Sequence, residues 1–116
     1  MPFINSRVSI PMTEQQKVSL KERLGDAIAL IPGKSEQWLM LELADNCGLY
    51  FQGTNAQPSA MIEIKVFGEI PEGCLGEMTK KICEIYETEL QIKQDRIYVK
   101  YEECFKWGWN GSNFSS

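Results

Sequence analysis

A strand–helix–strand pattern that occurs twice is the feature that most constrains how this 116-residue chain can fold. In the first half, the apolar segment Pro2–Ile10 precedes a helical segment, and the apolar run Trp38–Leu43 follows it. In the second half, Ser59–Phe67 precedes a helix that we predict over Glu72–Leu90, and Ile97–Tyr101 forms the last long strand. The two halves are alike in pattern and not in residue identity, and the break falls near residue 55.

The first helix has clear signals at both ends. Thr13 and Gln16 have the spacing of a capping box, and Pro32-Gly33 ends the helix. Its apolar side chains fall on one face, at Leu20, Leu24, Ala27, Ile28 and Ile31.

Two such units predict one α+β domain over residues 1–116. Its topology is βαββαβ, a four-stranded mixed sheet with both helices on one face. The other face carries apolar residues that two helices cannot cover, so we expect this face or the sheet edges to be buried by another subunit.

Composition excludes several classes of protein. The chain has 12 basic and 16 acidic residues and no Lys/Arg-rich block, which argues against nucleic-acid binding. No apolar run approaches the roughly 20 residues of a membrane helix. The chain start lacks a basic segment followed by an apolar one, so we predict no cleaved signal peptide and expect a cytoplasmic protein.

Histidine is absent, which removes the commonest general base and the commonest metal ligand. The cysteines, Cys47, Cys74, Cys83 and Cys104, form no CxxC pair and are expected to be free thiols. We predict no metal and no organic cofactor. Any base acting near neutral pH must then be a shifted carboxylate, a shifted lysine, a tyrosine, a thiolate or the amino terminus of the chain.

Several short segments occur together in a characteristic order. They are a proline directly after the initiator methionine, Gly33-Lys34 after the first helix, Pro58-Ser59-Ala60 at a strand entry, Asp95-Arg96-Ile97-Tyr98-Val99, and the ending Trp109-Asn110-Gly111-Ser112-Asn113-Phe114. With these segments the chain resembles the macrophage migration inhibitory factor and dopachrome tautomerase family, from Pro2 to Phe114.

The resemblance implies a homotrimer whose sheets enclose a central channel and whose active sites lie at the subunit interfaces. It also implies keto–enol tautomerisation of phenylpyruvate-like or dopachrome-like carboxylates. Pro2 would be the catalytic base once Met1 is removed, with apolar walls such as Phe3, Phe67, Trp107 and Trp109 lowering the pKa of its amine. Some relatives act as signalling proteins exported without a signal peptide.

Further site residues follow from the resemblance. Lys34 would bind the substrate carboxylate, and Val66 and Phe67 would line the pocket and present a backbone N–H to the substrate. Tyr98 would contact the substrate from the adjacent subunit, and Trp107 would lie at the rim.

Two positions depart from the best-known members of the family. Lys100 stands where they carry asparagine, which adds a positive charge near the mouth of the pocket. Trp107 replaces a smaller residue and should narrow the pocket. Two alternatives stay open, and Lys100 and Trp107 favour the first of them. One is a non-catalytic signalling or interaction protein with a vestigial pocket and a protein receptor. The other is a different reaction of the same amine, such as decarboxylation or hydration of a small acid.

Overall fold

The computed structural model describes residues 1–114, so the last two residues of the predicted domain lie outside the described residues. Its main sheet has the strand order β2-β1-β3-β4. The strands are β1 (Pro2–Val8), β2 (Met40–Ala44), β3 (Ala60–Phe67) and β4 (Ile97–Cys104). Strand β1 runs parallel to β2 and antiparallel to β3, and β3 runs parallel to β4. The prediction of a four-stranded mixed sheet is confirmed.

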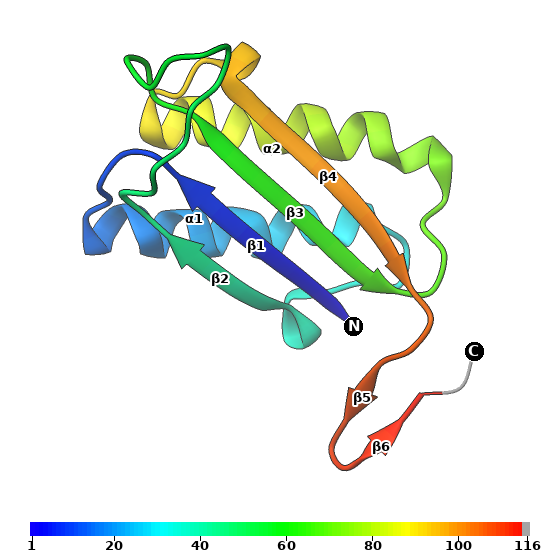
Figure 1. Cartoon of the computed structure of the whole chain (residues 1–116). Helices are drawn as coiled ribbons and strands as arrows, with labels where there is room; N and C mark the ends of the chain where they lie inside the picture. Colours follow the sequence, from blue (N-terminus) through cyan, green and yellow to red (C-terminus); the bar gives the residue numbers. More distant parts are fainter. Residues whose placement is uncertain (115–116) are drawn as a thin grey trace.

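Helices α1 (Glu14–Ala27) and α2 (Leu75–Leu90) cover one face of this sheet, as predicted (Figure 1). Thr13 and Gln16 form the expected capping box, with the Gln16 N–H donating to the Thr13 hydroxyl at 3.1 Å. The core lies between the helices and the sheet, where β3 buries Ile62, Ile64 and Val66 completely. None of the helices within residues 1–114 has the length and apolar character needed to cross a membrane.

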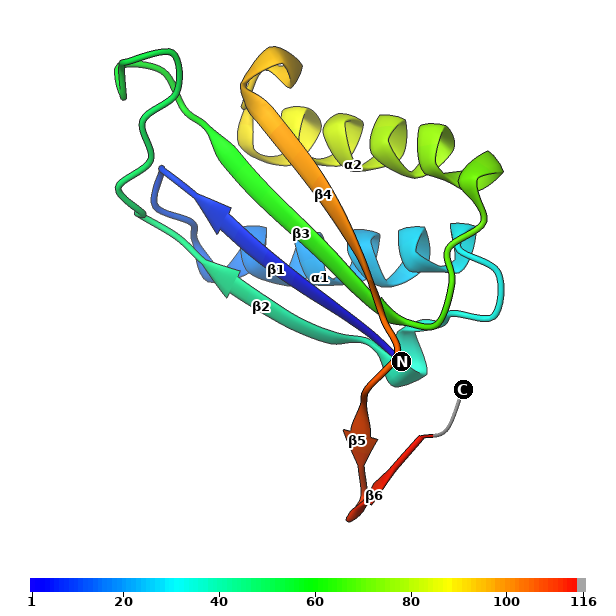
Figure 2. The same cartoon turned by 45° about the vertical axis from the view of Figure 1, so that its right-hand side comes forward.

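Several element boundaries differ from the sequence predictions. Trp38 lies in a short 3-10 turn (Glu36–Trp38), and β2 begins only at Met40. Strand β1 ends at Val8 rather than Ile10, and β4 continues to Cys104. The last segment forms a hairpin, β5 (Gly108–Trp109) and β6 (Ser112–Asn113), which projects beyond the end of the main sheet (Figure 2).

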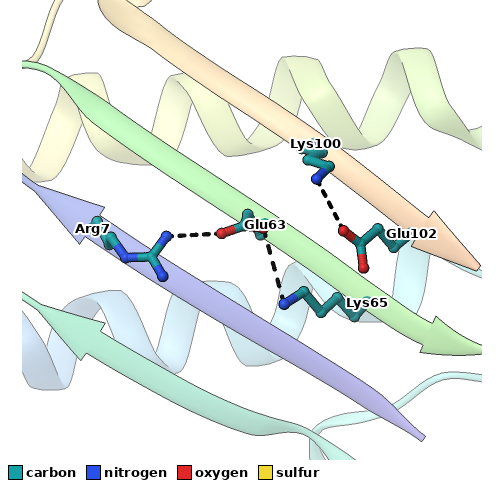
Figure 3. A network of polar contacts seen from close by, with 5 residues as sticks. All are labelled: Arg7, Glu63, Lys65, Lys100 and Glu102. Carbon is teal, nitrogen blue, oxygen red and sulfur yellow. Dashed lines mark hydrogen bonds and ion pairs between the residues drawn. The ribbon is translucent and has the colours of Figure 1, made fainter. Parts of the chain in front are cut away.

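The sheet face away from the helices, called the open face below, is charged in its middle. Glu63 pairs with Arg7 at 2.8 Å and lies 3.9 Å from Lys65, and Lys100 pairs with Glu102 at 3.0 Å (Figure 3). Exposed apolar side chains, among them Met40 and Tyr98, lie on this face as expected, but the charged pairs in its middle were not predicted. The leucines of the Trp38–Leu43 run pack against the core on the helix side, because side chains alternate along a strand.

Candidate active site

A cavity of about 750 Å³ lies at the start of β1. Three segments line it: the chain start Met1–Phe3, the segment Gln37–Leu41 and the entry to the hairpin, Trp107–Trp109. The segments meet because the first strand begins where β2 begins beside it and where the chain leaves β4 (Figures 1 and 2).

Pro2 is buried and is the first residue of β1. It lies opposite Val66 in the antiparallel ladder between β1 and β3. The carbonyl oxygen of Met1 accepts a hydrogen bond from the Phe67 N–H at 3.0 Å, which holds the first residues in line with the strand.

Lys34 approaches the same place from the loop after the first helix. Gly33 has a φ of 80°, which turns the chain after Ile31, and the Lys34 N–H donates to the Ile31 carbonyl at 3.1 Å. The Lys34 ammonium donates to the Phe67 carbonyl at 2.9 Å. The Lys34 cation is therefore held by a backbone oxygen of β3, the strand that pairs with β1 at the chain start.

Burial lowers the pKa of the Met1 amine below its ordinary value, and the nearby Lys34 cation lowers it further. Both causes act in the same direction, because each of them disfavours the protonated amine. The surroundings of the amino terminus thus favour a neutral nitrogen.

Aromatic rings form the outer wall of the cavity. Trp38 and Trp109 meet edge to face with centroids 5.2 Å apart, and Trp109 stacks on Phe114 at 6.5 Å. Phe114 also contacts the Phe67 ring at 5.2 Å. The hairpin therefore carries its rings back toward the beginning of the chain, and an apolar substrate group would find flat surfaces there.

The structure brings four of the predicted site residues to this end of the sheet, namely Pro2, Lys34, Phe67 and Trp107. Val66 lies there too, but its side chain is fully buried in the core and is closed to a ligand. Its part in binding is thereby restricted to the backbone.

Tyr98 and Lys100 do not reach the cavity within one chain. Tyr98 pairs with Met61, five residues along β3 from Val66, which corresponds to about 16 Å of strand. Lys100 lies on the open face, where the hydrogen bond and charge of Glu102 raise its pKa. Either residue could act on this cavity only in a second copy of the chain.

Sequence reasoning missed Gln37, Trp38 and Met40, which line the cavity. The apolar run that contains Trp38 looked like one continuous strand, while the Ser35-Glu36 start of the 3-10 turn was the available signal. Within the described part of the chain, no group of three His, Cys, Asp or Glu side chains is placed to hold a metal ion.

Comparisons with known proteins agree with this architecture. The family model described as macrophage migration inhibitory factor (MIF) matches residues 1–115. Macrophage migration inhibitory factor of Xenopus laevis is 25% identical over 117 residues, which cover 99% of this chain and all of the relative.

Solved structures show the same relationship. Leishmania major MIF2 is 32% identical with a TM-score of 0.91, covering 98% of this chain and 97% of the other. The MIF homologue of Prochlorococcus marinus is 29% identical with a TM-score of 0.81, covering 97% and 99%. With the family model matching nearly its whole length, this chain belongs to the macrophage migration inhibitory factor family, within the tautomerase superfamily.

Proposed function

We propose that this protein is a keto–enol tautomerase for small α-keto acids that carry an aromatic group, such as phenylpyruvate or dopachrome-like carboxylates. The observation that carries the proposal is the position of the Lys34 ammonium beside the chain start, which lines an aromatic cavity, together with the lowered pKa of the Met1 amine at this place. An amine that is neutral near pH 7 is a suitable proton shuttle in a chain without histidine.

The mechanism requires removal of Met1. While Met1 is attached, the Pro2 nitrogen is an amide and has no lone pair available for a proton. Initiator methionine is commonly removed before a residue as small as proline, and removal leaves a secondary amine at Pro2. It also frees the Phe67 N–H, which the Met1 carbonyl otherwise occupies, to donate to a substrate oxygen.

The surroundings set the protonation state of this amine. An ordinary α-amino group has a pKa of about 8, so only about a tenth of it is neutral at pH 7. Pro2 is buried, and the Lys34 cation lies at the same end of the sheet. We expect the same two causes that lower the pKa of the Met1 amine to act on the Pro2 amine once Met1 is removed, and to enlarge its neutral fraction.

The reaction then needs one base and one cation. The Pro2 nitrogen takes a proton from the carbon next to the ketone, forming an N–H bond while the C–H electron pair becomes the enolate. The same N–H returns the proton to the ketone oxygen and gives the enol. Lys34 holds the substrate carboxylate, and the wall of Trp38 and Trp109 receives the aromatic end.

We also propose that the working unit is a homotrimer. Tyr98 is 60% exposed and lies far from the cavity of its own chain, so its contact with substrate requires a neighbouring copy. Lys100, on the same open face, would then carry its charge toward the channel between the copies.

The test combines intact mass with an activity assay. Material whose mass shows loss of Met1 should tautomerise phenylpyruvate, and Pro2→Gly should lower kcat/KM at least about a hundredfold, since general-base catalysis contributes that much. Pro11→Gly, which changes an exposed proline beyond the opposite end of β1, is the matched control. Undiminished activity in Pro2→Gly would refute the proline mechanism, and an inactive, Met1-free trimer would instead support a signalling or interaction protein.

A further inference from the structure

Arg96 is a buried cation without an acidic partner. Its side chain is 8% exposed, and no carboxylate of residues 1–114 lies within ion-pair distance of it. Its guanidinium donates to four neutral oxygens instead. Nε donates to the Pro58 carbonyl at 3.1 Å and to the Ser59 hydroxyl at 3.0 Å. The Nη atoms donate to the Phe51 carbonyl at 3.4 Å and the Thr54 carbonyl at 3.1 Å.

These acceptors belong to one loop, residues 51–59, between β2 and β3. The loop turns back on itself at Gln52 and Gly53, which both have positive φ, and Phe51 and Thr54 exchange two backbone hydrogen bonds of 3.0 and 3.1 Å. The planar, forked guanidinium is the side chain that can satisfy several carbonyls in different directions at once. The loop is therefore wrapped around Arg96.

The same contact fixes an aromatic pair. The Phe51 ring lies over the guanidinium, 5.3 Å from its carbon, and meets the Tyr98 ring edge-on at 5.0 Å. Tyr98 is only two residues beyond Arg96 and is 60% exposed. Its outward ring is thus supported on one side by a phenylalanine whose own position depends on Arg96.

We propose that Arg96 is a positioning residue for the active site of the neighbouring subunit: through Phe51 it fixes the ring of Tyr98 at the angle at which that ring closes the neighbour's cavity. The proposal rests on the proposed function, since it needs both the trimer and the tautomerase site. Arg96 touches no substrate, and its effect is on the binding of the aromatic end of the substrate and not on the base.

Steady-state kinetics of Arg96→Met with phenylpyruvate give the first test. We expect KM to rise roughly three- to tenfold, the range that loss of one oriented aromatic contact would produce, while kcat and the pH profile stay close to wild type. Arg96→Lys should not restore KM, because an ammonium cannot reach the four acceptors. Arg23→Met, which removes an arginine of α1 paired with Glu89 of α2, should leave KM unchanged.

Mixed trimers test whether Arg96 acts across the interface. When Pro2→Gly and Arg96→Met subunits are co-expressed, the sites of the Pro2→Gly subunits lack the base. Every site that can still turn over substrate therefore has the intact Pro2 of an Arg96→Met subunit. Sites that face a Pro2→Gly neighbour regain an intact Arg96, so a population with the wild-type KM should appear. A single raised KM in the mixture, or an unchanged KM in Arg96→Met trimers, would overturn the proposal.

A substitute variant and two distinguishable outcomes keep the test decisive. If Arg96→Met does not fold, Phe51→Leu takes its place in the same mixture, because it removes the ring and leaves the backbone acceptor of the guanidinium. If the wild type lacks Pro2-dependent activity, the proposed function fails and this inference fails with it. Pro2-dependent activity with no low-KM sites in the mixture refutes the role of Arg96 alone.

Discussion

In the proposed mechanism, Lys34 couples substrate binding to acid–base chemistry. Its ammonium is fixed by the Phe67 carbonyl at 2.9 Å and lowers the pKa of the terminal amine. Lys34→Met should therefore raise that pKa, because a nearby positive charge no longer disfavours the protonated amine. Since the neutral amine is the proposed base, the acid limb of the kcat/KM profile should move to higher pH, and KM should rise through loss of the proposed carboxylate contact.

The pH dependence of kcat/KM in Lys34→Met measures both effects. Lys21→Met, which removes an exposed lysine of α1, is the matched control and should leave the acid limb in place. An acid limb unmoved by Lys34→Met would mean that burial alone sets the pKa of the amine.

A buried hydrogen bond between Ser6 and Tyr86 joins the sheet to α2. The two hydroxyls are 2.6 Å apart and both side chains are fully buried. Tyr86→Phe should lower the free energy of unfolding by about 1–3 kcal/mol, because it leaves the Ser6 hydroxyl without a partner. Urea titration measures the loss, and the double variant with Ser6→Ala should lose less than the sum of the single changes.

The same tyrosine predicts a loss of stability at alkaline pH. Burial raises the pKa of Tyr86 above its ordinary value, so the folded protein keeps this proton where the unfolded chain releases it. The unfolded state then binds fewer protons, and the free energy of unfolding falls as the pH rises above about 10. Tyr86→Phe should show a weaker decline over this range, and an identical decline would mean that other groups cause it.

At the scale of the element, α1 depends on its first turn. The Thr13 hydroxyl accepts from the Gln16 N–H, and the Gln16 side chain accepts from the Thr13 N–H at 2.9 Å. Thr13→Ala should lower the free energy of unfolding by about 1 kcal/mol, whereas Thr13→Ser keeps the hydroxyl and should lose much less. Urea titration distinguishes them, and equal stability of the alanine and serine variants would contradict the role of the cap.

The elements were the most predictable part of the molecule, since each carries a local signal. The capping box marked the start of α1, and the alternation of Ile62, Ile64 and Val66 marked β3. The hairpin after β4 was missed although Asn110-Gly111, with φ of 51° and 80°, is the sequence signal for a tight two-residue turn. Strand β2 was placed two residues too early, because an apolar 3-10 turn and an apolar strand look alike in sequence.

The site was less predictable, because it joins segments that no local pattern connects. Lys34 and Pro2 were predicted from the family resemblance. The register of β1 against β3 is what places Pro2 near the Phe67 carbonyl that Lys34 contacts. Gln37 carries no signal that separates it from other exposed glutamines, and only the folded chain places it at the cavity. The proposed role of Tyr98 concerns a neighbouring copy, and one chain alone does not bring it to the site.

At the scale of the whole molecule, the exposed aromatics predict association. Tyr50 is 72% exposed and Tyr98 is 60% exposed at the same end of the sheet, which is the kind of surface that subunit interfaces bury. We expect sedimentation equilibrium to give three times the chain mass of 13.3 kDa. Tyr50→Lys should shift the protein toward monomer, whereas Leu30→Lys, in the 3-10 turn (Ile28–Leu30) that follows α1, should not. A monomer mass for the wild type would rule out the trimer.

The hydrogen bond from the Phe67 N–H to the Met1 carbonyl has a consequence for the life of the protein in a cell. Met1 occupies this donor and makes the Pro2 nitrogen an amide, so under the proposed mechanism each new molecule would stay inactive until an aminopeptidase removes Met1. An affinity tag fused ahead of Pro2 would keep its nitrogen an amide and the protein inactive, so a tag for purification should follow Ser116.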